Sequence, residues 1–201
     1  MTTNSELNNQ NKGVQKTRER ILLAAAEIFS QNGFSATTTR SIADTAGLNE
    51  LTIFRYFKTK KLLFEAVIAQ FSPLQELDDL FTNKLTWNYR NDLMMIGTRF
   101  FNSVFKRRKE ILMSLFEAQR QMEVHEANQG TPLKMVEKMS SYLQEQMDRG
   151  QVRNLDTRSA AQAFFGMFLA SAINGRNSIE DSQIEKTVKD FVDLFYFGTA
   201  Q

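Results

Sequence analysis

Apolar residues recur at the three- and four-residue spacing of an amphipathic helix along nearly the whole chain. Only two prolines occur among the 201 residues, and no segment shows the apolar–polar alternation of a strand. These features predict an all-α fold. With 42% hydrophobic residues, the chain can bury one large hydrophobic core or two small, adjacent ones.

Cysteine is absent and His125 is the single histidine. This composition excludes disulfides, thiol catalysis, iron–sulfur clusters and zinc sites that need a thiolate. It also disfavours a histidine-dependent catalytic triad. No motif combines a nucleophile, a base and a group that orients them, so we predict no catalytic residue, no metal site and no cofactor.

Residues 1–13 are polar, rich in asparagine and end at Gly13, which indicates a disordered tail. This segment lacks the apolar centre of a signal peptide. No stretch elsewhere approaches the roughly 20 apolar residues of a membrane span. We therefore expect a cytoplasmic protein with no membrane partner.

Helical spacing and turn residues predict four helices before Pro73, and Pro73 itself indicates a junction. We expect a small domain over 14–72 and a larger domain of about six helices over 73–201. In the larger domain, Gly130-Thr131-Pro132 is expected to interrupt the chain and start a new helix. Residues 1–70 hold nine Lys/Arg and six Asp/Glu, and the remainder holds sixteen and seventeen, so the basic part is N-terminal.

The segment 38–60 has the spacing of a helix-turn-helix, with Gly47 at the turn and Asn49 as the N-cap of the second helix. The expected buried side of that helix is Ile53, Phe54 and Phe57. Its expected outer face, which a DNA major groove can admit, is Glu50, Leu51, Thr52 and Arg55, and Asn49 at its start is also expected to contact DNA. Hydroxyls and cations suited to phosphate contacts flank it, namely Thr38, Thr39, Tyr56, Lys58 and Lys60.

Residues 17–67 resemble the N-terminal part of the tetracycline-repressor (TetR) family of bacterial transcription regulators. The elements that carry the resemblance are Ile21, Ala25 and Phe29, then Gly33-Phe34, the threonines before Arg40, Ile42-Ala43, Gly47-Leu48, Tyr56-Phe57, and Lys60 ahead of Leu62-Leu63-Phe64. The resemblance covers about a quarter of the chain, and many coincident positions make it specific.

The resemblance implies roles for single positions. It implies phosphate contacts from Thr38, Thr39, Tyr56 and Lys60, and operator choice by Glu50, Leu51 and Thr52. It also implies a base-edge or phosphate contact from Arg40. Phe54 departs from the family pattern because the family usually has tyrosine there, so a phosphate hydrogen bond is lost.

The resemblance also implies an apolar effector cavity in the larger domain, since methionine and phenylalanine make adaptable linings. The candidate lining residues are Met94, Phe101, Phe105, Met113, Phe116 and Met122, and the open alternative is that they are ordinary core. The sequence lacks clustered buried charge here. We therefore expect an apolar or flat aromatic effector.

The last two predicted helices are apolar on more sides than one core contact needs. They suggest a four-helix interface across a two-fold axis in a homodimer, with burial inside the monomer as the alternative. The candidate interface residues are Phe164, Phe165, Phe168, Leu169, Phe191 and Phe195, and the small residues Ala163, Gly166 and Ala170 would permit close helix approach.

These features predict a sequence-specific DNA-binding transcriptional regulator, most simply a repressor. A small effector would release it from a pseudo-palindromic operator on double-stranded DNA. Two other classes stay open at this point: an adaptor that keeps the helix-turn-helix without reading DNA, and a helical enzyme acting on small molecules.

Overall fold

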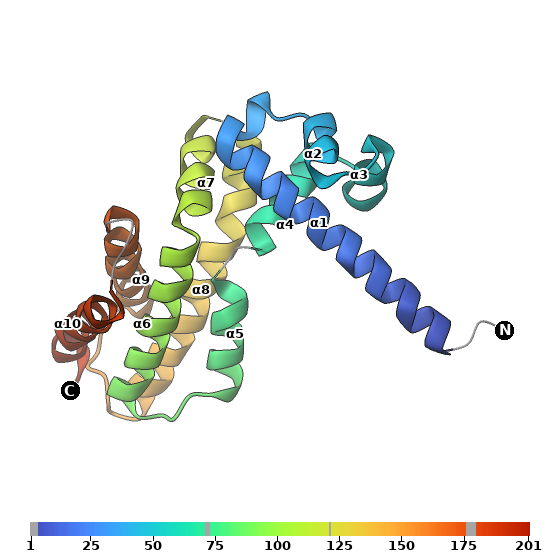
Figure 1. Ribbon diagram of the computed structural model, residues 1–201. Coiled ribbons are helices and arrows are strands. Elements are labelled where there is room, and N and C mark those ends of the chain that lie inside the picture. The colour runs from blue at the N-terminus through green and yellow to red at the C-terminus, as the bar shows by residue number, and fades with distance from the viewer. Residues whose placement is uncertain (1–3, 71–72, 121, 176–179) are drawn as a thin grey trace. The chain divides into compact units, whose positions relative to one another are not determined.

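The computed structural model describes residues 4–70, 73–120, 122–175 and 180–201, and for 4–11, 75, 116–120, 122–129 and 131 it describes the backbone alone. Within these ranges the regular elements are ten α-helices (Figure 1). One isolated antiparallel β-bridge pairs Val152 with Ala200. The all-α prediction is confirmed. No helix in the described ranges is long and apolar enough to cross a bilayer.

The chain divides into two compact units. The first contains 1–71 and 112–128, and the second contains 72–111 and 129–201. The division after residue 71 lies next to the boundary expected at residue 72. Residues 112–128, however, belong to the first unit rather than to the second, because side chains such as Met113 pack against the first unit's core.

The first unit is built on α1 (Asn4–Ala36), α2 (Thr39–Ala46), α3 (Glu50–Phe57) and α4 (Lys60–Gln70). It also takes most of α7 (Arg108–Arg120). Helix α1 packs against both α2 and α4, and α2 packs against α3. At the centre of this unit, the ring of Phe64 lies edge-on to Phe29 at 5.0 Å and to Phe34 at 5.1 Å between centroids.

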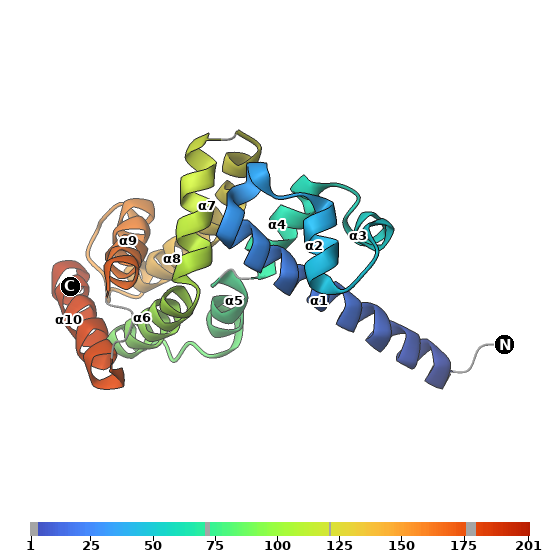
Figure 2. The same ribbon diagram turned by 45° about the horizontal axis from the view of Figure 1, so that its top comes forward.

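Helix α1 begins much earlier than the sequence indicates. It starts at Asn4, within the stretch 1–13 for which we expected a disordered tail, and its N-terminal half extends beyond α2, α3 and α4 (Figures 1 and 2). Helix cooperativity allows this extension, because a residue added to an existing helix gains one hydrogen bond for each residue fixed, whereas nucleation fixes several residues for the first bond. Gly33, at φ 75°, makes the kink near the other end of this helix.

The second unit contains α5 (Leu74–Asn83), α6 (Tyr89–Lys106), most of α8 (Met122–Asp148), α9 (Thr157–Asn174) and α10 (Asp181–Thr199). Helix α6 lies between α5 on one side and α9 and α10 on the other, and it packs against all three (Figure 1). Gly97 on α6 makes this packing close, because a Cβ there would lie 2.8 Å from Cζ of Phe168 on α9.

Pro132 lies inside α8, so the expected break at Gly130-Thr131-Pro132 is wrong. An internal proline removes one backbone hydrogen bond and costs about 3 kcal/mol. The apolar face of the same helix offsets this cost, because Met135, Met139 and Leu143 are buried in the core of the second unit.

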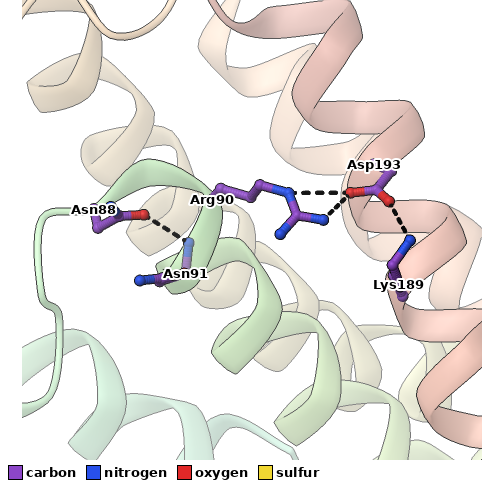
Figure 3. A network of polar contacts seen from close by, with 5 residues as sticks. All are labelled: Asn88, Arg90, Asn91, Lys189 and Asp193. Atoms are coloured by element: carbon purple, nitrogen blue, oxygen red, sulfur yellow. Dashed lines mark hydrogen bonds and ion pairs between the residues drawn. The ribbon is translucent and has the colours of Figure 1, made fainter.

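A polar network joins the start of α6 to α10 (Figure 3). Asp193 accepts hydrogen bonds from Lys189 Nζ at 2.9 Å and from Arg90 Nε at 3.1 Å. The hydrogen bond from Lys189, followed in importance by that from Arg90, holds the pKa of the Asp193 carboxyl below its usual value. Next to Arg90, the Asn88 side chain caps α6 by accepting from the Asn91 amide at 3.0 Å.

Candidate nucleic-acid interface

Local capping residues determine where α2 begins and ends. Thr38 Oγ1 accepts from the Ser41 amide at 3.0 Å, and Ser41 Oγ accepts in return from the Thr38 amide at 3.3 Å, which completes a capping box. Gly47 ends α2 in the left-handed conformation at φ 62°, as a sharp turn requires. Arg20 on α1 fastens this turn by donating to the Ala46 carbonyl at 2.6 Å.

Helix α3 begins after Asn49, whose side chain accepts from the Leu51 amide at 2.9 Å. Ile53 and Phe57 are its buried residues. Phe54 was expected on this inner side, but it is 43% exposed, and Leu51 is 75% exposed. Only a narrow strip of an eight-residue helix can face the core. Phe54 lies about 100° around the axis from Ile53 and therefore falls outside this strip.

The polar residues predicted for DNA contact lie on α2, α3 and the segments that flank them. Five of these side chains are exposed, namely Thr38, Arg40, Asn49, Arg55 and Lys58. Thr39, Glu50, Thr52, Tyr56 and Lys60 are half-buried. The structure brings two of them together, because Thr39 Oγ1 donates to Glu50 Oε1 at 2.5 Å. Glu50 thus braces the start of α3 against the start of α2, a role that the sequence did not indicate.

Lys60 is not a free cation at the surface. Its ammonium donates to the carbonyl oxygens of Phe34 at 2.8 Å, Thr37 at 2.9 Å and Ser35 at 3.4 Å. An ammonium has three donors, so these contacts occupy all of them. Lys60 thus holds the junction between α1 and α2, a role that the sequence did not indicate, and its phosphate contact stays a prediction.

Two arginines on α1, which belong to no motif in the sequence, also stabilise this unit. Arg20 holds the turn after α2, as described above, and the Arg18 guanidinium lies over the ring of Phe57 at 5.4 Å from its centroid. On α3, the Arg55 guanidinium lies 5.7 Å from the centroid of the Tyr56 ring. The partners of Arg18 and Arg20 are distant in sequence, so spacing alone could not have assigned these roles.

Residues 21–67 match the family model described as bacterial regulatory proteins of the tetR family. Residues 91–197 match the C-terminal domain model of AefR-like transcriptional repressors. The protein belongs to the TetR family of transcriptional regulators. It therefore carries a helix-turn-helix DNA-binding unit and a helical C-terminal body.

A curated relative and solved structures match this chain over nearly its whole length. The HTH-type transcriptional regulator YvkB of Bacillus subtilis is 29% identical over 189 residues, which span 92% of this chain and 98% of YvkB. A TetR-family regulator of Mesorhizobium loti superposes with a TM-score of 0.72 at 20% identity, over 93% of this chain and 98% of that one. FadR of Bacillus subtilis, solved with stearoyl-CoA, gives 0.71 at 20% identity over 90% and 98%.

The candidate effector residues of this TetR-family chain do not form one group. Phe101 is buried, and its ring stacks on that of half-buried Phe105 at 6.1 Å between centroids. Met94 is half-buried against the same core, whereas Met113 packs against the core of the first unit. The side chains of Phe116 and Met122 lie outside the described part of the structure.

The candidate dimer residues divide in a similar way. Four of them are buried in the core of the second unit, namely Phe164, Phe165, Phe168 and Phe195. They fill their own unit, which is the alternative that the sequence left open, and so they offer no free surface to a second chain. Leu169 and Phe191 are half-buried. The large apolar side chains that α10 leaves exposed are Leu194 at 66% and Phe197 at 77%.

Proposed function

We propose that this TetR-family protein represses transcription by binding a pseudo-palindromic operator as a homodimer, with α3 of each chain in a major groove. The observation that carries the proposal is the outer face of α3. Leu51, Phe54 and Arg55 are exposed there, while Ile53 and Phe57 anchor the helix from behind. A major groove is about 12 Å wide and admits one helix led by its N-terminal residues.

The residues of this face, together with neighbours on α2 and at the helix ends, suit different parts of the duplex. Leu51 and Phe54 are apolar groups that can contact thymine methyls, and Arg40 can donate to both acceptors of a guanine. Thr52 can bond to a base edge. Thr38 and Lys58 suit phosphate oxygens, which position the protein without selecting a sequence.

A homodimer would place two such helices about 34 Å apart, on successive major grooves of one face of the DNA. Exposed surfaces of α9 and α10 support this part of the proposal. Ala163, Gly166 and Ala170 are exposed along α9 and permit close approach, and Leu194 and Phe197 extend the apolar area along α10. These residues replace the buried phenylalanines as our candidates for the interface.

We further propose that a small apolar or aromatic effector binds the second unit and releases the operator. The phenylalanine-rich core around Phe101 and Phe105 supports an apolar ligand. FadR, a structural neighbour, was solved with stearoyl-CoA, which is consistent with an effector that has a long apolar part. Such a ligand changes operator occupancy only through its different affinities for the DNA-bound and free conformations.

The proposal is tested by recovering genomic fragments that bind the purified protein and measuring affinity for the recovered site by fluorescence anisotropy. Arg40→Ala should relax the preference for its base by about 1–3 kcal/mol, the value of one bidentate contact, and Leu51→Ala should change the preferred base at its own position. Lys58→Ala should weaken all duplexes similarly and lower the salt slope by about one. Enrichment of no sequence at low ionic strength would contradict operator reading and favour a non-reading adaptor.

A further inference from the structure

The second unit carries an open groove of about 860 Å³ between α5 and α8. Three aromatic side chains line it, namely Phe81, Trp87 and Tyr142. The Tyr142 ring contacts the other two, at 6.4 Å from Phe81 and 6.0 Å from Trp87 between centroids. The volume is within the range of small-molecule sites. None of the residues that we proposed for effector, DNA or dimer contacts lines this groove.

A buried carboxylate fixes this aromatic wall. Asp92 is fully buried and accepts from the Thr86 amide at 2.8 Å, from the Thr86 hydroxyl at 2.7 Å and from the Tyr142 hydroxyl at 3.0 Å. Burial raises the pKa of the Tyr142 hydroxyl, which therefore stays protonated and donates. Asp92 thus holds both the ring of Tyr142 and the residue before Trp87, so the wall is formed before any ligand arrives.

Trp87 is presented to solvent in an unusual backbone conformation. It is 42% exposed and adopts φ 62°, a left-handed value that is costly for a bulky residue. Strained residues of this kind persist where surrounding contacts hold them, and they occur often at ligand sites. The hydrogen bonds from Thr86 to Asp92 supply such contacts here.

An arginine of the same chain already stacks on the face of the Trp87 ring. The Arg149 guanidinium lies 4.1 Å from the centroid of the Trp87 ring, and Arg149 Nε donates to Glu145 Oε1 at 2.9 Å. An aromatic face combined with a carboxylate is the arrangement that recognises organic cations. Arg149 and Glu145 are both partly solvent-exposed, so a cation from solution can compete for this place.

The charges of the groove lining favour a cation over an anion. Its carboxylates are Asp78, Glu137 and Glu145, and its ammonium groups are Lys134 and Lys138. Lys138 pairs with Asp78 at 2.6 Å. The lining therefore has three negative and two positive groups, and the Arg149 guanidinium beside it balances the excess negative charge through its contact with Glu145.

We propose that this groove binds a planar organic cation of the amidinium or guanidinium class, which stacks on Trp87 in the place of Arg149 and pairs with Glu145. The groove residues belong to the second unit, whereas α2 and α3 belong to the first. The proposal goes beyond the regulator function described above and does not depend on it. Its test needs no DNA, so its failure is distinguishable from failure of operator binding.

Trp87 is the single tryptophan of the chain, so intrinsic fluorescence reports on this site directly. The probe is benzamidinium, and neutral benzamide of the same shape is the matched control ligand. Benzamidinium should change the emission saturably, and benzamide should bind at least about fivefold more weakly. Arg149→Gln should tighten benzamidinium binding about tenfold, because the internal competitor is gone.

Adding Glu145→Gln to the Arg149→Gln variant should reverse that gain. Asp148→Asn on the same helix is the matched control, because its carboxylate is exposed, pairs with Gln144 at 3.0 Å and does not line the groove. It should leave the affinity unchanged. Trp87→Leu, followed by calorimetry, should abolish binding, and circular dichroism checks that each variant is folded. Equal binding of benzamide, or no gain from Arg149→Gln, would overturn the proposal.

Discussion

The ammonium of Lys60 lies 2.8 Å from the carbonyl oxygen of Phe34 and 4.4 Å from the centroid of the Phe34 ring. One side chain at the start of α4 therefore holds the backbone that leads from α1 into α2. Because Thr38 follows directly and caps α2, this contact helps to set the entry of the helix-turn-helix. We therefore expect Lys60 to contribute to stability and its exposed neighbour Lys58 to contribute to DNA binding.

We expect Lys60→Met to lower the free energy of unfolding by about 1–2 kcal/mol, because three carbonyl groups lose a charged donor. Urea denaturation measures this change. Lys58→Met is the matched control, since Lys58 is exposed at the end of α3. It should leave stability unchanged and reduce the salt dependence of DNA binding. The opposite pattern, in which Lys60→Met alone alters the salt slope, would contradict this assignment and indicate a phosphate contact from Lys60.

Gly97→Ala should destabilise the second unit by about 1–2 kcal/mol, because the new methyl group would meet the Phe168 ring. The better helix propensity of alanine offsets only part of this cost. Gly130→Ala on α8 is the control, since nothing lies within 4 Å of a Cβ there. It should be neutral or stabilising by up to about 1 kcal/mol. Thermal unfolding of the two variants distinguishes the effects.

The network around Asp193 predicts a pH dependence of stability. Its carboxyl has a lowered pKa in the folded state, so the folded protein gains from Asp193 above the usual pKa of 3.8. That gain is lost as pH falls through the lower folded value. The denaturation midpoints of the wild type and Asp193→Asn should therefore differ most at neutral pH and converge below about pH 3.8. A difference that stays constant with pH would contradict this account.

Phe54→Tyr should tighten DNA binding by about two- to tenfold, because the new hydroxyl can donate to a phosphate at the edge of the α3 face. Anisotropy titration of the wild type and the variant measures the gain. The control is Thr45→Ala, at an exposed position at the end of α2. Phe57→Tyr would not serve as a control because Phe57 is buried. Weaker binding by Phe54→Tyr would indicate that Phe54 makes an apolar contact with bases.

Leu194→Asp combined with Phe197→Asp should convert the proposed dimer to monomers, because charged groups would be buried at the exposed α10 surface. Analytical ultracentrifugation measures the masses. Leu133→Asp, which alters an exposed leucine on α8, should leave the mass unchanged. Monomers in the wild type, or dimers in the double variant, would remove this surface from the account.

The helix-turn-helix could be predicted from sequence because local signals define it. Thr38, Gly47 and Asn49 act within four residues of their own positions, as caps and turns do. The role of Lys60 was not predictable, because its partners Phe34 and Thr37 lie 26 and 23 residues away. Only the folded chain brings these groups together.

The roles of the apolar residues of α9 in the second unit could not be predicted from sequence for a different reason. Helix α9 is apolar almost all round, and this pattern is the same for a helix in a monomer core and for one at a dimer interface. Packing against Gly97 places Phe168 in the core. The groove at Trp87 could not be predicted from sequence, because its lining combines residues that are distant along the chain. Trp87 lies in a loop, and Tyr142, on α8, lies 55 residues later.

The central claim is that two copies of this TetR-family chain read one operator through α3. The most direct measurement is an anisotropy titration of the recovered operator against the same duplex with one half-site scrambled, at several salt concentrations. We predict two chains per intact duplex, a preference over unrelated DNA of at least about a thousandfold, and a large loss when one half-site is scrambled. Equal affinity for intact, scrambled and unrelated duplexes would contradict the claim.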